Sequence, residues 1–336
     1  MQMNWRRGLG ISLTLSIVVA MVLVWKTFDE GTLTNLGLLE PRFLALAVLF
    51  LLVAIAIEGQ RIRLVAAAMG ARINWARGCL IFLSTIFAGL VTPMGMGEIP
   101  ALTYLYNRAG LNLGASLAAA IVRGFVTKLV FLTGIIWLFG LARGRVQFGP
   151  VTGDLFTVVA LVFAATTVFS AAYVLFPGLL QGLFAKLPRR WQQGFLSKWQ
   201  QQLELEAREF DRGLRIMWGR GPWSLFRIAF LTLGYWTVWF GILPVLARGL
   251  GVKADPALLI SRQFALTLAL PFIPVPGGSG AVELAMAGMY QGVVPRNVLG
   301  IFILAWRLTT YYLPLLLGAM AALGSLWGYQ GRNTEH

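Results

Sequence analysis

The chain has 336 residues, of which 58% are apolar and only 12% are charged, and this excludes a soluble domain, where about 25% of residues carry a charge. A single cysteine, Cys79, excludes an internal disulfide, and the lone His336 leaves too few ligands for a zinc site and no histidine-activated nucleophile. The net charge of +15 suits loops that face anionic lipid headgroups, so we expect no nucleic-acid partner. We also expect no metal, no cofactor and no enzymatic activity.

The first predicted helix, residues 9–25, follows Arg6 and Arg7 and resembles a signal peptide. No small-residue cleavage site follows it, so we expect an uncleaved span whose N-terminus is cytoplasmic. The remaining apolar segments are, in chain order, 43–57, 79–106, 115–140, 155–176, 225–247, 257–291 and 298–326. Because a crossing needs about 20 apolar residues, these segments predict a single polytopic membrane domain over residues 1–336.

Two of the segments are interrupted by similar Pro- and Gly-rich sequences, TPMGMGE from Thr92 and PVPGGSGAVE from Pro274. At one offset of 185 residues three pairs match, which are Gly95 with Gly280, Glu98 with Glu283, and Arg77 with Arg262. An arginine follows each glutamate, Arg123 after 25 residues and Arg307 after 24. Paired breaks of this kind are typical of discontinuous helices around the central site of transporters with inverted repeats.

The distribution of Lys and Arg decides the path of the first interrupted segment. Cytoplasmic loops carry the usual excess of Lys and Arg only if this segment returns to the cytoplasm as a hairpin. The same count does not decide the second interrupted segment, which we assign as a hairpin by analogy. The predicted fold class is therefore all-α integral membrane, an inverted repeat with three transmembrane helices plus one re-entrant helical hairpin in each half, residues 8–147 and 155–327.

Residues 177–224 form the only long predicted loop, within the second repeat. From Trp191 to Trp218 the apolar residues have helical spacing, with acidic and basic residues between them. We expect a cytoplasmic amphipathic helix that lies on the inner leaflet. The alternative is a docking site for a partner protein, such as a lipid-biosynthesis protein.

The two breaks predict a polar cavity, because irregular backbone at membrane depth persists only inside protein or beside water. Each half-helix that begins at a break presents free N–H groups and a partial positive charge, which suit an anion such as phosphate. The glycines predicted to line this binding site are Gly95, Gly97, Gly277, Gly278 and Gly280.

Two interpretations of the charged residues remain open. Glu98 and Glu283 lie in or just past the first turn of a half-helix, where a carboxylate is favourable and can pair with an arginine only to hold the fold. Alternatively, ionisable groups within the membrane mark a substrate or ion site. The carboxylates then carry protons or contact a headgroup amine, while Arg123 and Arg307 bind phosphate. Lys128, deeper in its segment, is a further predicted binding residue and needs a partner.

Other charged residues lie near the predicted ends of helices. Arg77 and Arg262 are predicted to gate headgroup access at the hairpin mouths, although the positive-inside rule explains Arg77 equally well. Glu58, Arg61 and Arg63 are interpreted as a snorkelling charge group at the cytoplasmic end of the second helix.

Both breaks carry a resemblance to a known family. The first motif of the lysylphosphatidylglycerol synthase transmembrane-region family, also called flippase-like, resembles TPMGMGE followed by Tyr104, Arg108-Ala109-Gly110 and Arg123. Its second motif resembles PVPGGSGAVELAMAGMY followed by Arg307, Thr309, Tyr311 and Pro314. The resemblance covers residues 40–325, and Met94 and Met96 stand where glycine and isoleucine or leucine are more usual.

The resemblance implies a polytopic domain that moves a lipid between the leaflets of the bacterial inner membrane. In lysylphosphatidylglycerol synthases a soluble aminoacyl-transferase domain follows it; this sequence ends at His336, so we expect a stand-alone member that does not synthesise the aminoacylated lipid. We therefore predict a flippase-like lipid transporter whose partners are membrane lipids, with an anionic or phosphate-bearing headgroup. The alternatives are a non-transporting membrane scaffold and an enzyme of lipid metabolism.

Overall fold

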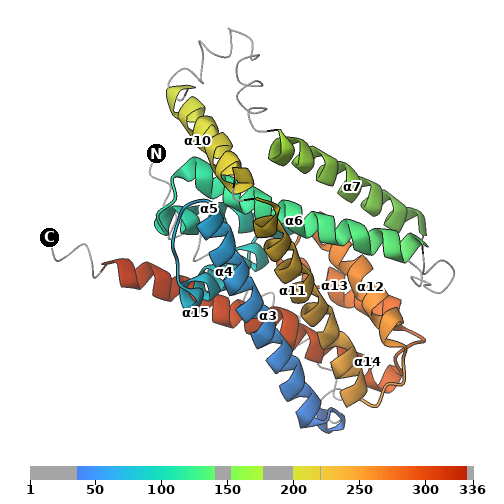
Figure 1. Ribbon diagram of the computed structural model, residues 1–336. Helices are drawn as coiled ribbons and strands as arrows, with labels where there is room; N and C mark the ends of the chain where they lie inside the picture. Colours follow the sequence, from blue (N-terminus) through green and yellow to red (C-terminus); the bar gives the residue numbers. More distant parts are fainter. Residues whose placement is uncertain (1–35, 141–152, 177–199, 220, 331–336) are drawn as a thin grey trace.

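The computed structural model describes residues 36–140, 153–176, 200–219 and 221–330, and these ranges contain helices but no strand (Figure 1). Five of the described helices are long and apolar enough to cross a membrane, namely Pro41–Ala68, Leu113–Ile136, Thr157–Leu175, Trp223–Gly249 and Arg296–Gly324. Each coincides with one of the predicted uninterrupted segments, so these five predictions are confirmed. The predicted helix at residues 9–25 and residues 177–199 of the predicted loop lie outside the described ranges.

The elements of the first half follow one another from a short 3-10 turn to α7. They are η1 (Leu36–Leu38), α3 (Pro41–Ala68), α4 (Trp75–Leu90), η2 (Pro93–Gly95), α5 (Glu98–Arg108), α6 (Leu113–Gly140) and α7 (Gly153–Leu175). The later elements are α10 (Gln200–Gly219), α11 (Pro222–Gly249), α12 (Pro256–Ala269), η3 (Leu270–Phe272), η4 (Pro276–Gly278), α13 (Ala281–Tyr290), α14 (Arg296–Arg307), the π-helical turn η5 (Leu308–Tyr312) and α15 (Leu313–Gln330).

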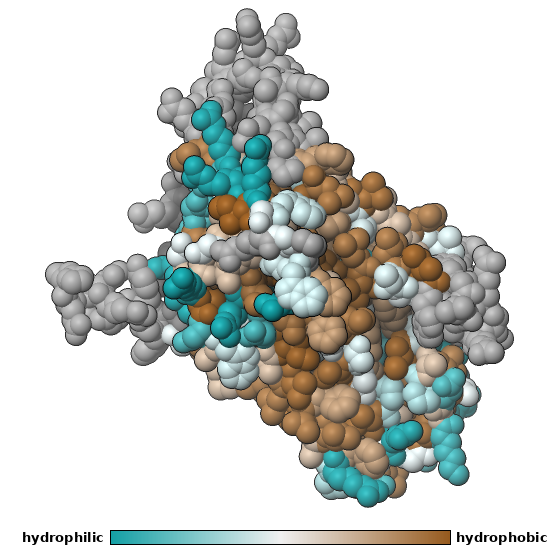
Figure 2. Space-filling model, in the orientation of Figure 1, coloured by the Kyte–Doolittle hydropathy of each residue, from teal (hydrophilic) through white to brown (hydrophobic). Residues whose placement is uncertain are grey.

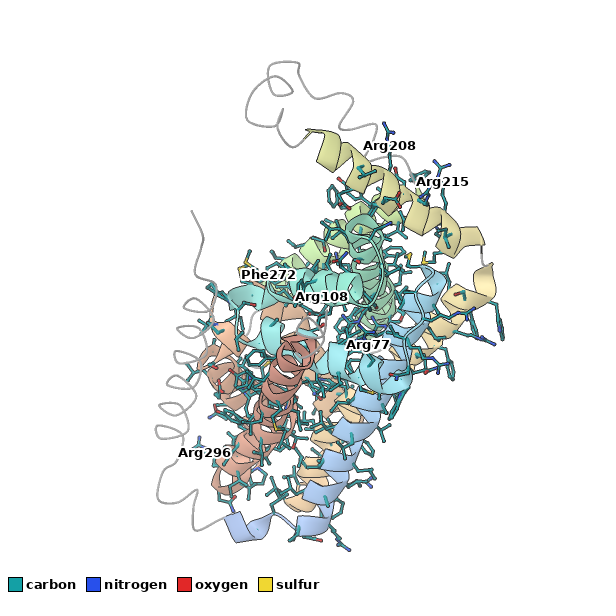
Figure 3. All side chains as sticks on the ribbon, turned by 90° about the vertical axis from the view of Figure 1, so that its left-hand side faces the viewer. Arg77, Arg108, Arg208, Arg215, Phe272 and Arg296 are labelled. Atoms are coloured by element: carbon teal, nitrogen blue, oxygen red, sulfur yellow. The ribbon has the colours of Figure 1, made fainter. Side chains whose placement is uncertain are left out.

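Apolar side chains cover the middle of the molecular surface, as a membrane-spanning protein requires. Figure 2 shows a broad hydrophobic band across one face, with hydrophilic side chains toward its two ends. On α7, Val168 and Phe169 are among the most exposed large apolar side chains. Arg208 and Arg215 of α10 lie at one end of the molecule, whereas Arg296 at the start of α14 lies toward the other (Figure 3).

Glycines allow the helices of the bundle to cross closely. A Cβ atom at Gly78 of α4 would overlap the carbonyl oxygen of Gly59 on α3. In the same way, a Cβ atom at Gly318 of α15 would lie 2.5 Å from the carbonyl oxygen of Leu83 on α4. Small residues bring helix backbones together in membranes, where lipid removes the hydrophobic drive for association and dispersion contacts must hold the helices.

Each interrupted segment forms two helices separated by an irregular turn, as the Pro- and Gly-rich sequences predict. The two turns have the same backbone conformation, since Met94 in η2 has φ 57° and ψ 12° and Gly277 in η4 has φ 59° and ψ 11°. Within each segment the two helices pack together, α4 with α5 and α12 with α13, and η2 contacts η4. The two breaks therefore meet, while their re-entrant path and the inverted repeat stay predictions.

The residue offset that aligns the two turns in the structure is two residues shorter than the offset that aligns the two motifs in the sequence. Pro93–Gly95 and Pro276–Gly278 form equivalent turns, so the offset between the turns is 183 residues rather than 185. As a consequence, Glu98 is the first residue of α5, whereas Glu283 is the third residue of α13. The two glutamates that match in sequence thus occupy different helical positions.

Helix α10 covers the later part of the predicted amphipathic helix. Its apolar residues Phe210, Leu214 and Met217 are buried in the core, and the helix packs against α6. The side chains of Arg208 and Arg215 are exposed on the outer face. The apolar face of α10 is thus covered by protein, and its contact with the inner leaflet or with a partner protein stays a prediction.

Candidate functional site

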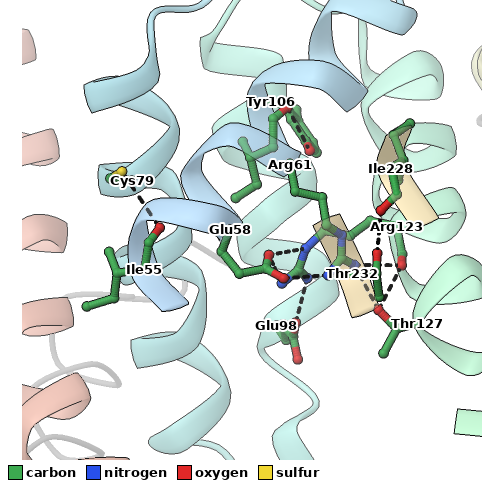
Figure 4. Close-up of polar contacts among 11 residues, drawn as sticks. Ile55, Glu58, Arg61, Cys79, Glu98, Tyr106, Arg123, Thr127, Ile228 and Thr232 are labelled. Atoms are coloured by element: carbon green, nitrogen blue, oxygen red, sulfur yellow. Dashed lines mark hydrogen bonds and ion pairs between the residues drawn. The ribbon is translucent and has the colours of Figure 1, made fainter. Parts of the chain in front are cut away.

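Arg123 of α6 lies at the centre of a charged cluster beside α5, the helix that follows the first break (Figure 4). Its Nη1 donates to Oε1 of Glu98 at 2.8 Å, and its Nε and Nη2 donate to Oε2 of Glu58 at 3.2 and 3.0 Å. Three segments distant in sequence, on α3, α5 and α6, are joined by this single guanidinium. The predicted pairing of Arg123 with Glu98 is therefore present, with a second carboxylate that sequence reasoning did not assign to it.

Arg61 of α3 completes the cluster. Its Nη1 donates to Oε1 of Glu58, and its Nη2 donates to the Arg123 carbonyl at 2.9 Å and to Oγ1 of Thr127 at 2.8 Å. Glu58 and Arg61 are both fully buried, so their interpretation as snorkelling interfacial charges is wrong. The physical reason is that their spacing of three residues turns both side chains toward α6, where Arg123 compensates the carboxylate. Arg63 is exposed.

The cluster contains two carboxylates and two guanidiniums, so its formal charges cancel. Glu98 is the most exposed member, with 47% of its side chain accessible, compared with 10% for Arg123 and 0% for Glu58. The carboxylate of Glu98 therefore lies between a buried arginine and the surface of the first break.

The second break contains a more enclosed ion pair. Arg307 of α14 binds Glu283 of α13 in a bidentate manner, with Nε to Oε1 at 2.7 Å and Nη2 to Oε2 at 3.0 Å. Its Nη1 also donates to the Gly277 carbonyl at 3.2 Å. The Gly280 N–H donates to Glu283 Oε2 at 2.7 Å, so this glutamate also caps its own helix. Bidentate arginine–carboxylate geometry is among the strongest of protein ion pairs.

Tyr311 packs against both Arg307 and the second break. Its ring centroid lies 4.9 Å from the guanidinium carbon of Arg307, within the range of a cation–π contact. A Cβ atom at Gly277 would overlap this ring, so the close approach requires glycine. Tyr311 belongs to the π-helical turn η5, and such turns occur frequently at functional sites.

At the first break the N–H of the N-cap residue Gly97 is bound by Thr92, whereas at the second break the corresponding N–H is bound by Glu283. Thr92 Oγ1 accepts a hydrogen bond from the Gly97 N–H at 2.8 Å and donates to the Ala88 carbonyl at 2.8 Å. Glu98, at the first position of α5, makes no cap to the Gly97 N–H. The predicted glycines differ accordingly: Gly95, Gly277, Gly278 and Gly280 have positive φ, whereas Gly97 allows close approach to Ala88.

Lys128 and the two predicted gating arginines lie apart from the ion pairs. Lys128 Nζ donates to Ser170 Oγ at 2.8 Å and to the Thr166 carbonyl at 3.2 Å, which joins α6 to α7. Arg77 Nη2 donates to the Arg108 carbonyl at 2.8 Å, and the two residues lie close together in Figure 3. Arg262 donates in the same way to the Met289 carbonyl. Each of these two arginines ties the two helices of its break together, and their gating role stays a prediction.

A groove of about 340 Å³ runs between α5 and the start of α6. Most of its lining is apolar, and the lining residues are Ile99, Pro100, Thr103, Tyr104, Asn107, Leu113 and Leu117. The groove therefore offers apolar surface on α5, the helix that begins with Glu98. Within the described ranges, no group of three His, Cys, Asp or Glu side chains is arranged to hold a metal ion.

These features define a multi-pass helical membrane protein with ion pairs at two adjoining helix breaks. The chain belongs to the family described as the lysylphosphatidylglycerol synthase TM region, whose model matches residues 11–318, so the predicted family is confirmed. A UPF0104 membrane protein of Archaeoglobus fulgidus is 24% identical over 327 residues, which cover 94% of this chain and 96% of the relative. No solved structure matches the chain.

Proposed function

We propose that this protein moves a phosphate-bearing lipid between the leaflets of the bacterial inner membrane, with its N-terminus in the cytoplasm. The proposal rests above all on the pair at the first break, in which Arg123 is buried and the Glu98 side chain is 47% exposed. Such a pair keeps an arginine charged within an apolar bundle and leaves a position where a second anion can bind. The family description names a lipid synthase, which supports a lipid as the ligand.

The lipid headgroup binds where the two breaks meet. Its phosphate displaces Glu98 from Arg123, and the positive ends of the helix dipoles at the starts of α5 and α13 add favourable partial charges. The Glu283–Arg307 pair lies at the second break, which contacts the first. One acyl chain lies in the groove between α5 and the start of α6, and the rest of the lipid tails stay in the bilayer. Glu98 thus alternates between pairing with Arg123 and releasing it.

Exchange of one anion for another avoids the largest cost of charge in a membrane. When Glu98 leaves, Arg123 keeps Glu58, but Glu58 also pairs with Arg61, so the cluster has one positive charge too many. An uncompensated buried charge costs about 3–5 kcal/mol. Replacing a carboxylate by a phosphate keeps Arg123 paired throughout, and both anions accept charge-assisted hydrogen bonds from a guanidinium. The exchange therefore needs no intermediate in which the buried cluster carries an uncompensated charge.

Translocation in reconstituted vesicles tests the proposal. Fluorescent phosphatidylglycerol in the inner leaflet becomes accessible to a membrane-impermeant quencher only when it reaches the outer leaflet. We expect the protein to speed this step over empty vesicles, and the Glu98→Gln/Glu283→Gln double variant to slow it. Arg63→Gln, which changes an exposed charge on α3, is the matched control. Unmoved and intact lipid would indicate a scaffold instead, and a chemically altered lipid would indicate an enzyme.

A further inference from the structure

The two arginines at the breaks differ in how completely they are held. All three nitrogens of Arg307 are bound within its own break, to both oxygens of Glu283 and to the Gly277 carbonyl. Glu283 is 15% exposed and also accepts the Gly280 N–H. Releasing this glutamate therefore breaks a helix cap as well as an ion pair.

Arg123 instead divides its donors between two carboxylates. Nε and Nη2 bind Glu58, which is fully buried, and only Nη1 binds the half-exposed Glu98. Because Thr92 binds the Gly97 N–H, Glu98 can leave Arg123 without breaking a cap. The first pair is consequently the easier one to open.

Glu58 and Arg61 determine the charge that remains after Glu98 leaves. Glu58 contributes one negative charge, while Arg61 and Arg123 contribute one positive charge each, so the remaining cluster carries one net positive charge. One singly charged anion restores neutrality, and a phosphodiester has that charge. Arg61 also binds the backbone carbonyl of Arg123, so it fixes the turn of α6 from which the guanidinium projects.

We infer that the two ion pairs have different tasks. Glu98–Arg123 is the pair that exchanges with a phosphodiester headgroup, and Glu283–Arg307 is a fixed clamp that holds the second break. Glu58 and Arg61 are positioning residues, which keep Arg123 oriented and balanced while Glu98 is displaced. The inference rests on the proposed function for its ligand and goes beyond it by giving the two glutamates different roles.

Thiol accessibility tests the difference between the pairs without a transport assay. In a Cys79→Ala background, Glu98→Cys and Glu283→Cys are each exposed to a water-soluble maleimide. We expect Glu98→Cys to react at least about tenfold faster, because reactivity follows exposure. Glycerophosphoglycerol, a soluble phosphodiester, should protect Glu98→Cys alone. Equal reaction rates would overturn the inference, and better protection by inorganic phosphate would overturn the assignment to a phosphodiester.

Transport kinetics test the positioning residues. The Glu58→Gln/Arg61→Gln double variant removes one acid and one base, so the net charge of the cluster is unchanged. We expect its KM for the lipid to rise about tenfold, as loss of a buried charge-assisted hydrogen bond predicts, while the maximal rate falls less. Arg63→Gln serves as the control on the same helix. An unchanged KM would overturn the role of Glu58 and Arg61.

The two experiments separate the inference from the proposed function. If the native protein moves no lipid, the proposed function fails, while selective protection of Glu98→Cys by glycerophosphoglycerol still supports an exchanging pair. If the native protein moves lipid but both cysteines react equally, the function stands and the division of tasks fails. If the double variant at Glu58 and Arg61 does not fold, the accessibility experiment decides alone, since it leaves both residues intact.

Discussion

Replacing Gly277 by alanine tests the contact that joins the second break to Arg307. Gly277 has φ 59°, in the left-handed region, where a residue with a side chain costs about 1–2 kcal/mol. A Cβ atom there would lie 2.7 Å from Tyr311 Cζ, whereas ordinary contacts begin at 3.4 Å, and overpacking costs about 1–3 kcal/mol. We expect Gly277→Ala to lose about 2–5 kcal/mol of stability and to move Tyr311 away from Arg307.

Gly95 in the first break supplies the control for this substitution. Its φ is 68°, but a Cβ atom there would meet no other atom within 4 Å. Gly95→Ala should therefore lose only the backbone contribution of about 1–2 kcal/mol. The apparent melting temperatures of both purified variants are compared in one detergent with that of the native protein. If the two variants melt at the same temperature, the argument that Tyr311 packs onto Gly277 is refuted.

Three further substitutions test other contacts. Gly78→Ala should lower the melting temperature, because its methyl group would overlap the Gly59 carbonyl; an unchanged temperature would contradict this close crossing. Thr92→Val removes the acceptor of the Gly97 N–H and should cost about 1–3 kcal/mol, whereas Thr92→Ser keeps it; equal melting of the two variants would count against this bond. Leu117→Trp fills the groove beside α5 and should slow translocation several-fold without lowering the melting temperature; a native rate would place the acyl chain elsewhere.

The spans and the breaks are predictable because few local structures are stable in a bilayer. A long apolar run in lipid must form a helix, since no water is present to satisfy its backbone groups. Pro93 and Pro276 lack an N–H donor and therefore interrupt that helix at the predicted positions. The sequence also allows each break glutamate to pair with the arginine that follows it, and both pairs are present.

The burial of Glu58 and Arg61 against Arg123 is not predictable in the same way. The apolar run of the second predicted helix stops at residue 57, so Glu58 and Arg61 have the pattern of charges at a membrane interface. Helix α3 instead continues to Ala68 and carries both side chains into the bundle. A glutamate and an arginine three residues apart also pair on exposed helix surfaces. Only their contact with Arg123 on a distant helix distinguishes the two cases, and sequence spacing does not report such contacts.

The two-residue shift between the breaks shows why similar motifs need not act alike. A carboxylate at the third position of a helix can reach back to the N–H of the N-cap residue, and Glu283 does so. A carboxylate at the first position, where Glu98 lies, makes no such contact, and Thr92 supplies the acceptor instead. Exchange at one break and clamping at the other thus follow from where each glutamate falls relative to its turn. A match of residue types at a constant offset conceals this difference, because the turns and the glutamates repeat at different offsets.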